Sequence, residues 1–146
     1  MKKHSMKKVL SVFLCMVLIA AMALMLSGCN DSVEVPDMQY ETFAEGQSLG
    51  QGATTFTLVV CDAEGKETTA QISTDETILG QALLDLKLIA GEDSEYGMYI
   101  KTVNGITYDY DTDGKYWALY IDGEYALTGI DSTEIAPDAV YMLKAE

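Results

Sequence analysis

The sequence of 146 residues contains no arginine, one histidine and three cysteines, and these scarcities exclude several classes of function. The histidine is His4, so the chain beyond it offers no imidazole for a zinc site or for a Ser-His or Cys-His pair. Carboxylate pairs are abundant, but among 23 acidic residues they arise by chance. We therefore expect a protein that is not an enzyme, that has no metal ligated by histidine and that contains no catalytic residues.

Positive charge is also scarce. Nine lysines stand against 23 aspartates and glutamates, which gives a formal charge of −14. Four of the lysines lie in the first eight residues, so the chain after residue 28 has a formal charge of −18. Nucleic acids and anionic headgroups bind proteins through lysine and arginine and are poor partners for such a surface. The acidity is typical of a soluble surface domain.

The N-terminus has the composition of a secretory signal. Lysines precede an apolar run at residues 9–26, and Leu26-Ser27-Gly28-Cys29 follows it directly. This tetrapeptide resembles a bacterial lipobox, whose cysteine becomes the lipidated first residue after cleavage. We predict a lipoprotein signal peptide at residues 1–28 and a lipid anchor on Cys29 in the bacterial membrane, outside the cytoplasm. The alternative is an uncleaved transmembrane helix, since about 18 apolar residues can span a bilayer.

A third cysteine remains for the folded part of the chain. Cys15 lies in the predicted signal peptide and Cys29 is the predicted anchor, so Cys61 has no partner for an internal disulfide. We interpret it as a small buried residue on a strand, with a reactive thiol as the alternative.

The chain after the signal divides into two parts. Residues 29–53 lack apolar periodicity and carry five acidic residues and three glycines, so we expect an acidic flexible stalk. Residues 54–146 have the patterns of a folded domain. Alternating apolar residues predict strands at 54–62 and 67–72, and a capping-box spacing followed by apolar residues at helical spacing predicts a helix over 74–90.

Two residue pairs indicate tight turns, because both tolerate positive φ. Asn104-Gly105 separates predicted strands at 98–103 and 107–110, and Asp122-Gly123 lies at the centre of an aromatic hairpin at 115–129. A last strand is predicted at 139–145. The sum is an α+β domain, a roll that looks like the β-grasp arrangement, with one helix packed on a mixed sheet built from hairpins.

The aromatic hairpin contains the single tryptophan, Trp117. One interpretation places Trp117 on the inward face of a central strand, and the other places it in an exposed binding patch. The chain also has five tyrosines at positions 99, 108, 116, 120 and 125. These are too many for one small core, so we expect some of them to form an exposed patch of the kind that marks binding.

Four segments carry a resemblance to a known family: residues 77–83 (TILGQAL), 99–105 (YIKTVNG), 116–119 (YWAL) and 127–130 (LTGI). Their order and spacing resemble the transcobalamin-like C-terminal domain. That family includes the β-domain of vitamin B12 carriers such as transcobalamin and intrinsic factor, and domains of bacterial surface lipoproteins. The resemblance implies a module that binds cobalamin or a related corrinoid, with the ligand held by Thr102, Trp117, Leu127 and Gly129.

The sequence departs from the carriers in two respects. Ala118 stands where they commonly have a glutamine, and the chain has no segment corresponding to their helical barrel. Binding by this domain alone should therefore be weak or should need a partner, such as a helical barrel or a transporter. The alternative is a cell-surface module that shares the fold but binds a glycan or another protein.

The acidic segment 109–114 matches the first half of a calcium loop, with aspartates at alternate positions and glycine at the sixth. The twelfth position is Tyr120, where the loop needs a bidentate glutamate, and a strand is predicted where the calcium motif continues as a helix. We interpret the segment as an acidic connection between strands.

Calcium should therefore have no effect on stability. We expect the melting temperature to stay unchanged when calcium is added to millimolar concentration. A calcium-dependent rise would instead establish a site in the segment 109–114.

Overall fold

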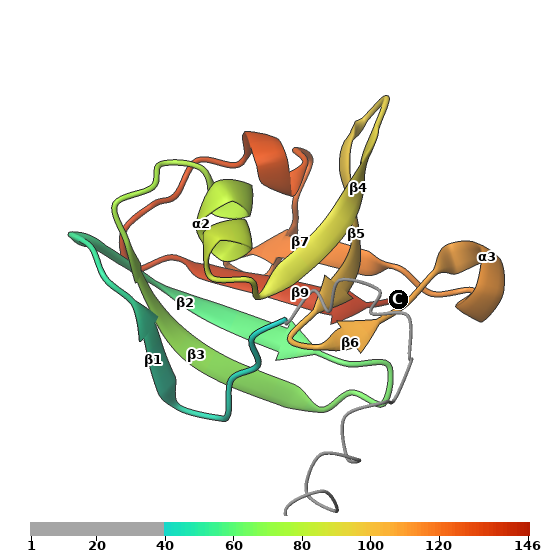
Figure 1. Cartoon of the computed structure of the whole chain (residues 1–146), viewed down its shortest axis with the longest axis horizontal. Helices are drawn as coiled ribbons and strands as arrows, with labels where there is room; N and C mark the ends of the chain where they lie inside the picture. Colours follow the sequence, from blue (N-terminus) through green and yellow to red (C-terminus); the bar gives the residue numbers. More distant parts are fainter. Residues whose placement is uncertain (1–39) are drawn as a thin grey trace, which may run out of the picture. The chain divides into compact units, whose positions relative to one another are not determined.

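The computed structural model describes residues 40–146, which form two sheets, one main helix and two shorter helical turns (Figure 1). The larger sheet has the order β1-β3-β2-β9-β7-β8, and the smaller has the order β4-β5-β6. The expected α+β class, with a helix on a mixed sheet, is confirmed. The strands of the larger sheet are β1 (Gln47–Gly50), β2 (Thr54–Cys61), β3 (Glu67–Thr74), β7 (Trp117–Ile121), β8 (Glu124–Tyr125) and β9 (Val140–Ala145). The other elements are β4 (Ile89–Ser94), β5 (Gly97–Val103), β6 (Ile106–Thr107), α2 (Leu79–Asp85), α3 (Tyr110–Asp113) and the 3-10 turn η1 (Ile130–Ser132).

One face of the larger sheet forms the floor of the core. Leu58 pairs with Tyr141, and Val60 pairs with Leu143, so alternate residues of β2 and β9 lie on the same face. These side chains belong to one buried cluster with residues of α2 and of the smaller sheet, including Leu83 and Val103. The helix and the smaller sheet therefore cover the same apolar face, as the amphipathic pattern predicts.

The two predicted tight turns are confirmed. Asn104 and Gly105 have φ of 49° and 76°, and Asp122 and Gly123 have φ of 50° and 88°. Positive φ at both central residues matches the right-handed twist of the flanking strands, and Asn, Asp and Gly tolerate it best. Each dipeptide therefore sets the register of its hairpin, β5–β6 in the first case and β7–β8 in the second.

The main helix is shorter than predicted. Thr74 still belongs to β3, and the helix begins only at Leu79. Ile135 N donates to Thr77 O and Ile78 forms a bridge with Glu134, so tertiary pairing displaces the capping box. The helix ends where Lys87 takes a φ of 56°, and the amide of Leu88 donates to Leu83 O as in a Schellman motif. The prediction of a helix over 74–90 is right in kind but wrong at both ends.

Strand β4 lies where the end of the helix was expected. Gly91, directly after the predicted helix, pairs with Ile100 at a bulge, where a Cβ would clash with Tyr99 O. Apolar spacing alone did not distinguish Ile89 as a strand residue from the last turn of a helix. The smaller sheet therefore has a strand that the sequence pattern did not reveal.

The predicted stalk at 29–53 overlaps the folded domain. Phe43 is buried, its amide donates to Asn104 Oδ1 at 2.7 Å, and residues 47–50 form β1, parallel to β3. The expectation of a flexible stalk is wrong for these residues. Their backbone hydrogen bonds are made with residues distant in sequence, which the local sequence pattern does not reveal. The signal peptide 1–28, Cys29 and the first part of the stalk lie outside the described residues. Within residues 40–146, no helix has the length and apolar character to cross a membrane.

Tyr141 should be a strong test of the core. Its hydroxyl accepts from Ala136 N at 2.8 Å and donates to Glu134 O at 3.1 Å, while its buried ring meets Phe56 edge-on. Tyr141→Phe should lower the free energy of unfolding by about 1 to 3 kcal/mol, because both backbone groups lose their partner. Chemical denaturation measures this loss. The exposed Tyr96→Phe is the control, with an expected change within about 0.5 kcal/mol, and an equal effect of the two variants would contradict the assignment.

Candidate functional site

Trp117 lies in the interior, at the first position of β7. Its side chain is 5% exposed, Nε1 donates to Lys101 O at 3.1 Å, and the ring of Tyr108 lies 5.2 Å away between centroids. The interpretation of Trp117 as an inward-facing strand residue is confirmed. Its indole face is therefore not part of an exposed patch.

The other three residues implied by the resemblance lie in different surroundings. Thr102 on β5 is 4% exposed, and its hydroxyl lies 2.8 Å from the hydroxyl of Thr107. Leu127 is 98% exposed in the loop after β8, and Gly129 directly precedes η1. Trp117 and Gly129 line one hollow, whereas Thr102 belongs to the interior of the smaller sheet.

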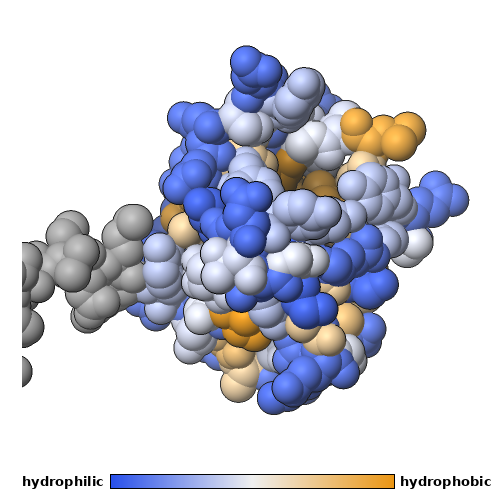
Figure 2. All heavy atoms as spheres, turned by 90° about the vertical axis from the view of Figure 1, so that its right-hand side faces the viewer, coloured by the Kyte–Doolittle hydropathy of each residue, from blue (hydrophilic) through white to orange (hydrophobic). Residues whose placement is uncertain are grey.

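This hollow lies between β5 on one side and β7, β8 and the following loop on the other. We call it the apolar hollow, and its volume is about 160 Å³. Figure 2 shows a depression with an apolar floor on the side of the molecule that lies at the right in Figure 1. No charged residue lines it: its walls are Met98, Tyr99, Ile100, Tyr116, Trp117, Ala118, Leu119, Tyr125, Ala126, Thr128, Gly129 and Ile130.

One wall of the apolar hollow is an open strand edge. Tyr116 and Glu146 exchange both backbone hydrogen bonds at 2.9 Å, so the N–H and C=O of the next residue, Trp117, point away from β9. β8 pairs with β7 only at Tyr120 and Ile121 and does not reach Trp117. The hollow therefore combines apolar side chains with backbone groups that can bind an amide.

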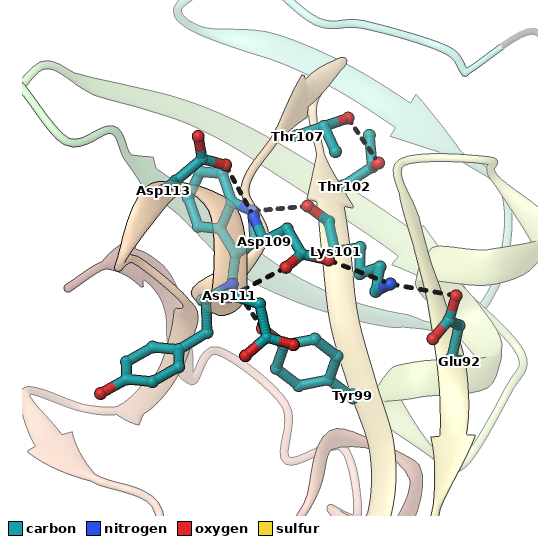
Figure 3. A network of polar contacts seen from close by, with 10 residues as sticks. Glu92, Tyr99, Lys101, Thr102, Thr107, Asp109, Asp111 and Asp113 are labelled. Atoms are coloured by element: carbon teal, nitrogen blue, oxygen red, sulfur yellow. Dashed lines mark hydrogen bonds and ion pairs between the residues drawn. The ribbon is translucent and has the colours of Figure 1, made fainter.

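A second hollow adjoins the first and shares Tyr99 and Tyr116 with it. We call it the polar hollow; its volume is about 490 Å³, and its other lining residues are Glu92, Lys101, Asp109, Tyr110 and Asp111. In Figure 3, Lys101 lies between two carboxylates, with Nζ 3.0 Å from Glu92 and 3.2 Å from Asp109. The hydrogen bond from Lys101 lowers the pKa of the Asp109 carboxyl, and those carboxylates raise the pKa of Lys101.

The acidic segment 109–114, interpreted as a connection between strands, forms the helical turn α3. Asp109 caps α3 by accepting from Asp111 N at 3.0 Å, and Asp113 Oδ2 accepts from Asp109 N at 2.9 Å. The strand predicted at 107–110 therefore stops after Thr107. In the described part of the chain, no group of three or more acidic, cysteine or histidine side chains is placed to hold a metal ion.

The tyrosines divide between the core edge and the surface. Tyr108 packs on Trp117, and Tyr99, Tyr116 and Tyr120 are half-buried, whereas Tyr125 is exposed. The expectation was that some of these five tyrosines form an exposed patch, and it holds for Tyr125 alone. The sequence pattern missed Tyr96 and Tyr110, which are 92% and 61% exposed. The position of Tyr96 next to Gly97, in a turn between strands, is the signal that could have indicated its exposure.

The opposite face of the larger sheet carries its own polar group. Glu146 accepts from Tyr120 Oη and pairs with Lys144, and these contacts lower the pKa of its carboxyl. Cys61 is buried on this face, as expected of a small strand residue, and burial raises the pKa of its thiol.

Comparisons with known proteins agree with this fold. The model of a family described as a domain of unknown function (DUF4430) matches residues 75–141. No curated protein matches the chain. A crystal structure from Ruminococcus gnavus ATCC 29149, of a protein provisionally described as metal binding, is 29% identical, with a TM-score of 0.61; it covers 64% of this chain and 97% of its own.

Haptocorrin, solved in complex with Cbi, is a more distant likeness. It is 18% identical with a TM-score of 0.48, and the match covers 67% of this chain but 26% of haptocorrin. This chain thus corresponds to about a quarter of haptocorrin's length. Neither of these two proteins is described as an enzyme, and both are described by what they bind.

Removing Lys101 should change the titration of the polar hollow. In Lys101→Met, the Asp109 carboxylate loses the ammonium that stabilises its charged form, so its pKa should rise towards the usual value. In the wild type, the stabilisation from this pair should disappear as the pH falls through the lowered pKa of Asp109, and in the variant it should be absent throughout. A carboxyl ¹³C NMR titration measures the pKa. Lys66→Met is the control, and an unchanged Asp109 pKa in Lys101→Met would contradict the pairing.

Proposed function

We propose that this protein is a bacterial lipoprotein, anchored through Cys29 outside the cytoplasm, whose domain binds cobalamin or a related corrinoid at the apolar hollow. The observation that carries the proposal is the fully exposed Leu127 beside a hollow that contains no charged side chain. An exposed leucine next to an apolar depression is a feature of a surface that binds a ligand.

The chemistry of the hollow suits such a ligand. A corrin is a large, mostly apolar plate with amides around its edge. Met98 and Tyr125 offer apolar contact, and the open edge at Trp117 offers a hydrogen-bond donor and an acceptor for an amide. No charge pairing is needed, which agrees with the scarcity of lysine and arginine.

The four residues implied by the resemblance then have different roles. Leu127 and Gly129 would contact the ligand directly. Trp117 would contribute its backbone and, with its indole bonded to Lys101 O, would hold β5 and β7 at a fixed separation. Thr102 would stabilise the smaller sheet through Thr107, since its hydroxyl has a partner inside the protein.

The size of the hollow argues for a partner. At about 160 Å³ it is smaller than the 300 to 1,000 Å³ of a usual small-molecule site, so it can hold only an edge of a corrinoid. The remaining surface of the ligand would stay in water unless another protein covered it. A helical domain or a transporter in the same membrane would complete the site.

A glycan is the second candidate, and the polar hollow favours it. Tyr99, Tyr110 and Tyr116 present aromatic rings next to the carboxylates of Glu92 and Asp111. Aromatic faces beside hydrogen-bond acceptors suit the apolar faces and hydroxyls of a sugar. A metal ligand, suggested by the description of the R. gnavus protein, finds no cluster of suitable side chains in residues 40–146.

Calorimetric titration of the full chain, purified in detergent, with hydroxocobalamin tests the proposal. We expect saturable binding that Leu127→Ala weakens at least tenfold, equivalent to about 1.4 kcal/mol. Leu84→Ala, at a 38% exposed leucine on α2, should leave the affinity unchanged. Trp117→Ala is unsuitable, because removing a buried indole costs about 3 to 5 kcal/mol of stability. The absence of any heat of binding at millimolar hydroxocobalamin would rule out the corrinoid, and glycans would be tested next.

A further inference from the structure

A second large side chain projects from the surface close to Leu127. Tyr96 is 92% exposed in the turn that joins β4 to β5, and Leu127 is 98% exposed in the loop before η1. The two segments meet at Gly129, where a Cβ would lie 3.8 Å from Tyr96 O. Single exposed apolar residues are ordinary, but two on touching segments form a patch.

Asp131 holds these two segments together. Its Oδ2 accepts from Met98 N at 3.3 Å, directly after the turn that carries Tyr96. Gly97 and Gly129 both lie against this carboxylate. A Cβ would come within 2.8 Å of Oδ1 at Gly97 and within 2.6 Å at Gly129. A β-carbon at either position would push the carboxylate from its place between the segments, and the φ of 102° at Gly97 itself favours glycine.

The turn itself is also ordered. Ser94 Oγ accepts from Tyr96 N at 3.2 Å and donates to Gly97 O. Tyr96 therefore lies in a turn that Ser94 holds from within and that Asp131 holds at the residue directly after it. The backbone at Tyr96 is therefore held in place while its side chain extends into water, where a ligand can cover it.

We propose that Tyr96 and Leu127 form the two sides of a rim that grips the edge of the corrinoid at the apolar hollow, so that Tyr96 is a ligand-contacting residue. This inference rests on the proposed function. Neither rim side chain is charged, nor is any residue that lines the hollow, and the one carboxylate described between the two segments, Asp131, accepts from Met98 N. This is in a domain where residues 40–146 have five lysines against 20 acidic residues. An uncharged plate fits this rim, whereas a basic peptide would be attracted to the acidic surface elsewhere.

Titrating hydroxocobalamin into the full chain in detergent tests the rim. We expect Tyr96→Ala to weaken binding at least fivefold, because the aromatic ring supplies the contact, and Tyr96→Phe to bind as the wild type does. Leu84→Ala is the control, since this exposed leucine on α2 lines neither hollow and should leave the affinity unchanged. Melting temperatures within about a degree of the wild type would establish that each variant is folded.

The outcomes separate the two claims. If the wild type binds and Leu127→Ala weakens binding, but Tyr96→Ala behaves as Leu84→Ala does, the rim is overturned and the proposed function stands. If the wild type does not bind hydroxocobalamin, both are overturned. Loss of binding in Tyr96→Phe as well would assign the effect to the hydroxyl and would overturn the apolar grip.

Discussion

The position of β9 between β2 and β7 is the constraint on which the rest of the structure depends. β9 runs parallel to β2 and antiparallel to β7, and it joins the N-terminal strands β1, β2 and β3 to the aromatic hairpin (Figure 1). Without it, the core would lose Tyr141 and Leu143, both fully buried. The larger sheet cannot be completed until the last strand is in place, so its stability comes from contacts that are distant in sequence.

The candidate site is a consequence of this arrangement. β7 belongs to the larger sheet through β9, while β5 belongs to the smaller one, and no pairing joins β5 to β7 in the described residues. The two strands are linked instead by side chains, chiefly the indole of Trp117 on Lys101 O. A space between strands held in this way offers open backbone on one wall and apolar side chains on the other, and both kinds of group suit a large neutral ligand.

The site could be predicted only in part. The family resemblance named Leu127 and Gly129, which lie at the apolar hollow or its edge, but it also named Thr102, whose hydroxyl is used inside the smaller sheet. In a strand whose residues alternate between two faces, a tyrosine or tryptophan faces the core only if its face of the sheet is the covered one. The periodicity of the sequence does not reveal which face is covered. Tyr96 was missed because no turn was predicted before Gly97, and its position next to the loop of Leu127 depends on the contact between Met98 and Asp131, 33 positions apart in the chain.

The sequence by itself determined the features that depend on neighbouring residues: the strand β2, its return as β3, and the turns at Asn104-Gly105 and Asp122-Gly123. Their causes are local. The alternation of apolar and polar residues assigns each side chain to one face of a strand, and only certain residues tolerate positive φ. Only the tertiary structure decided the length of α2, the existence of β4, the docking of Phe43 and the burial of Trp117. In each of these cases the hydrogen bonds or the covering side chains come from elements distant in the chain, and this long-range pairing outweighs the weaker local preference.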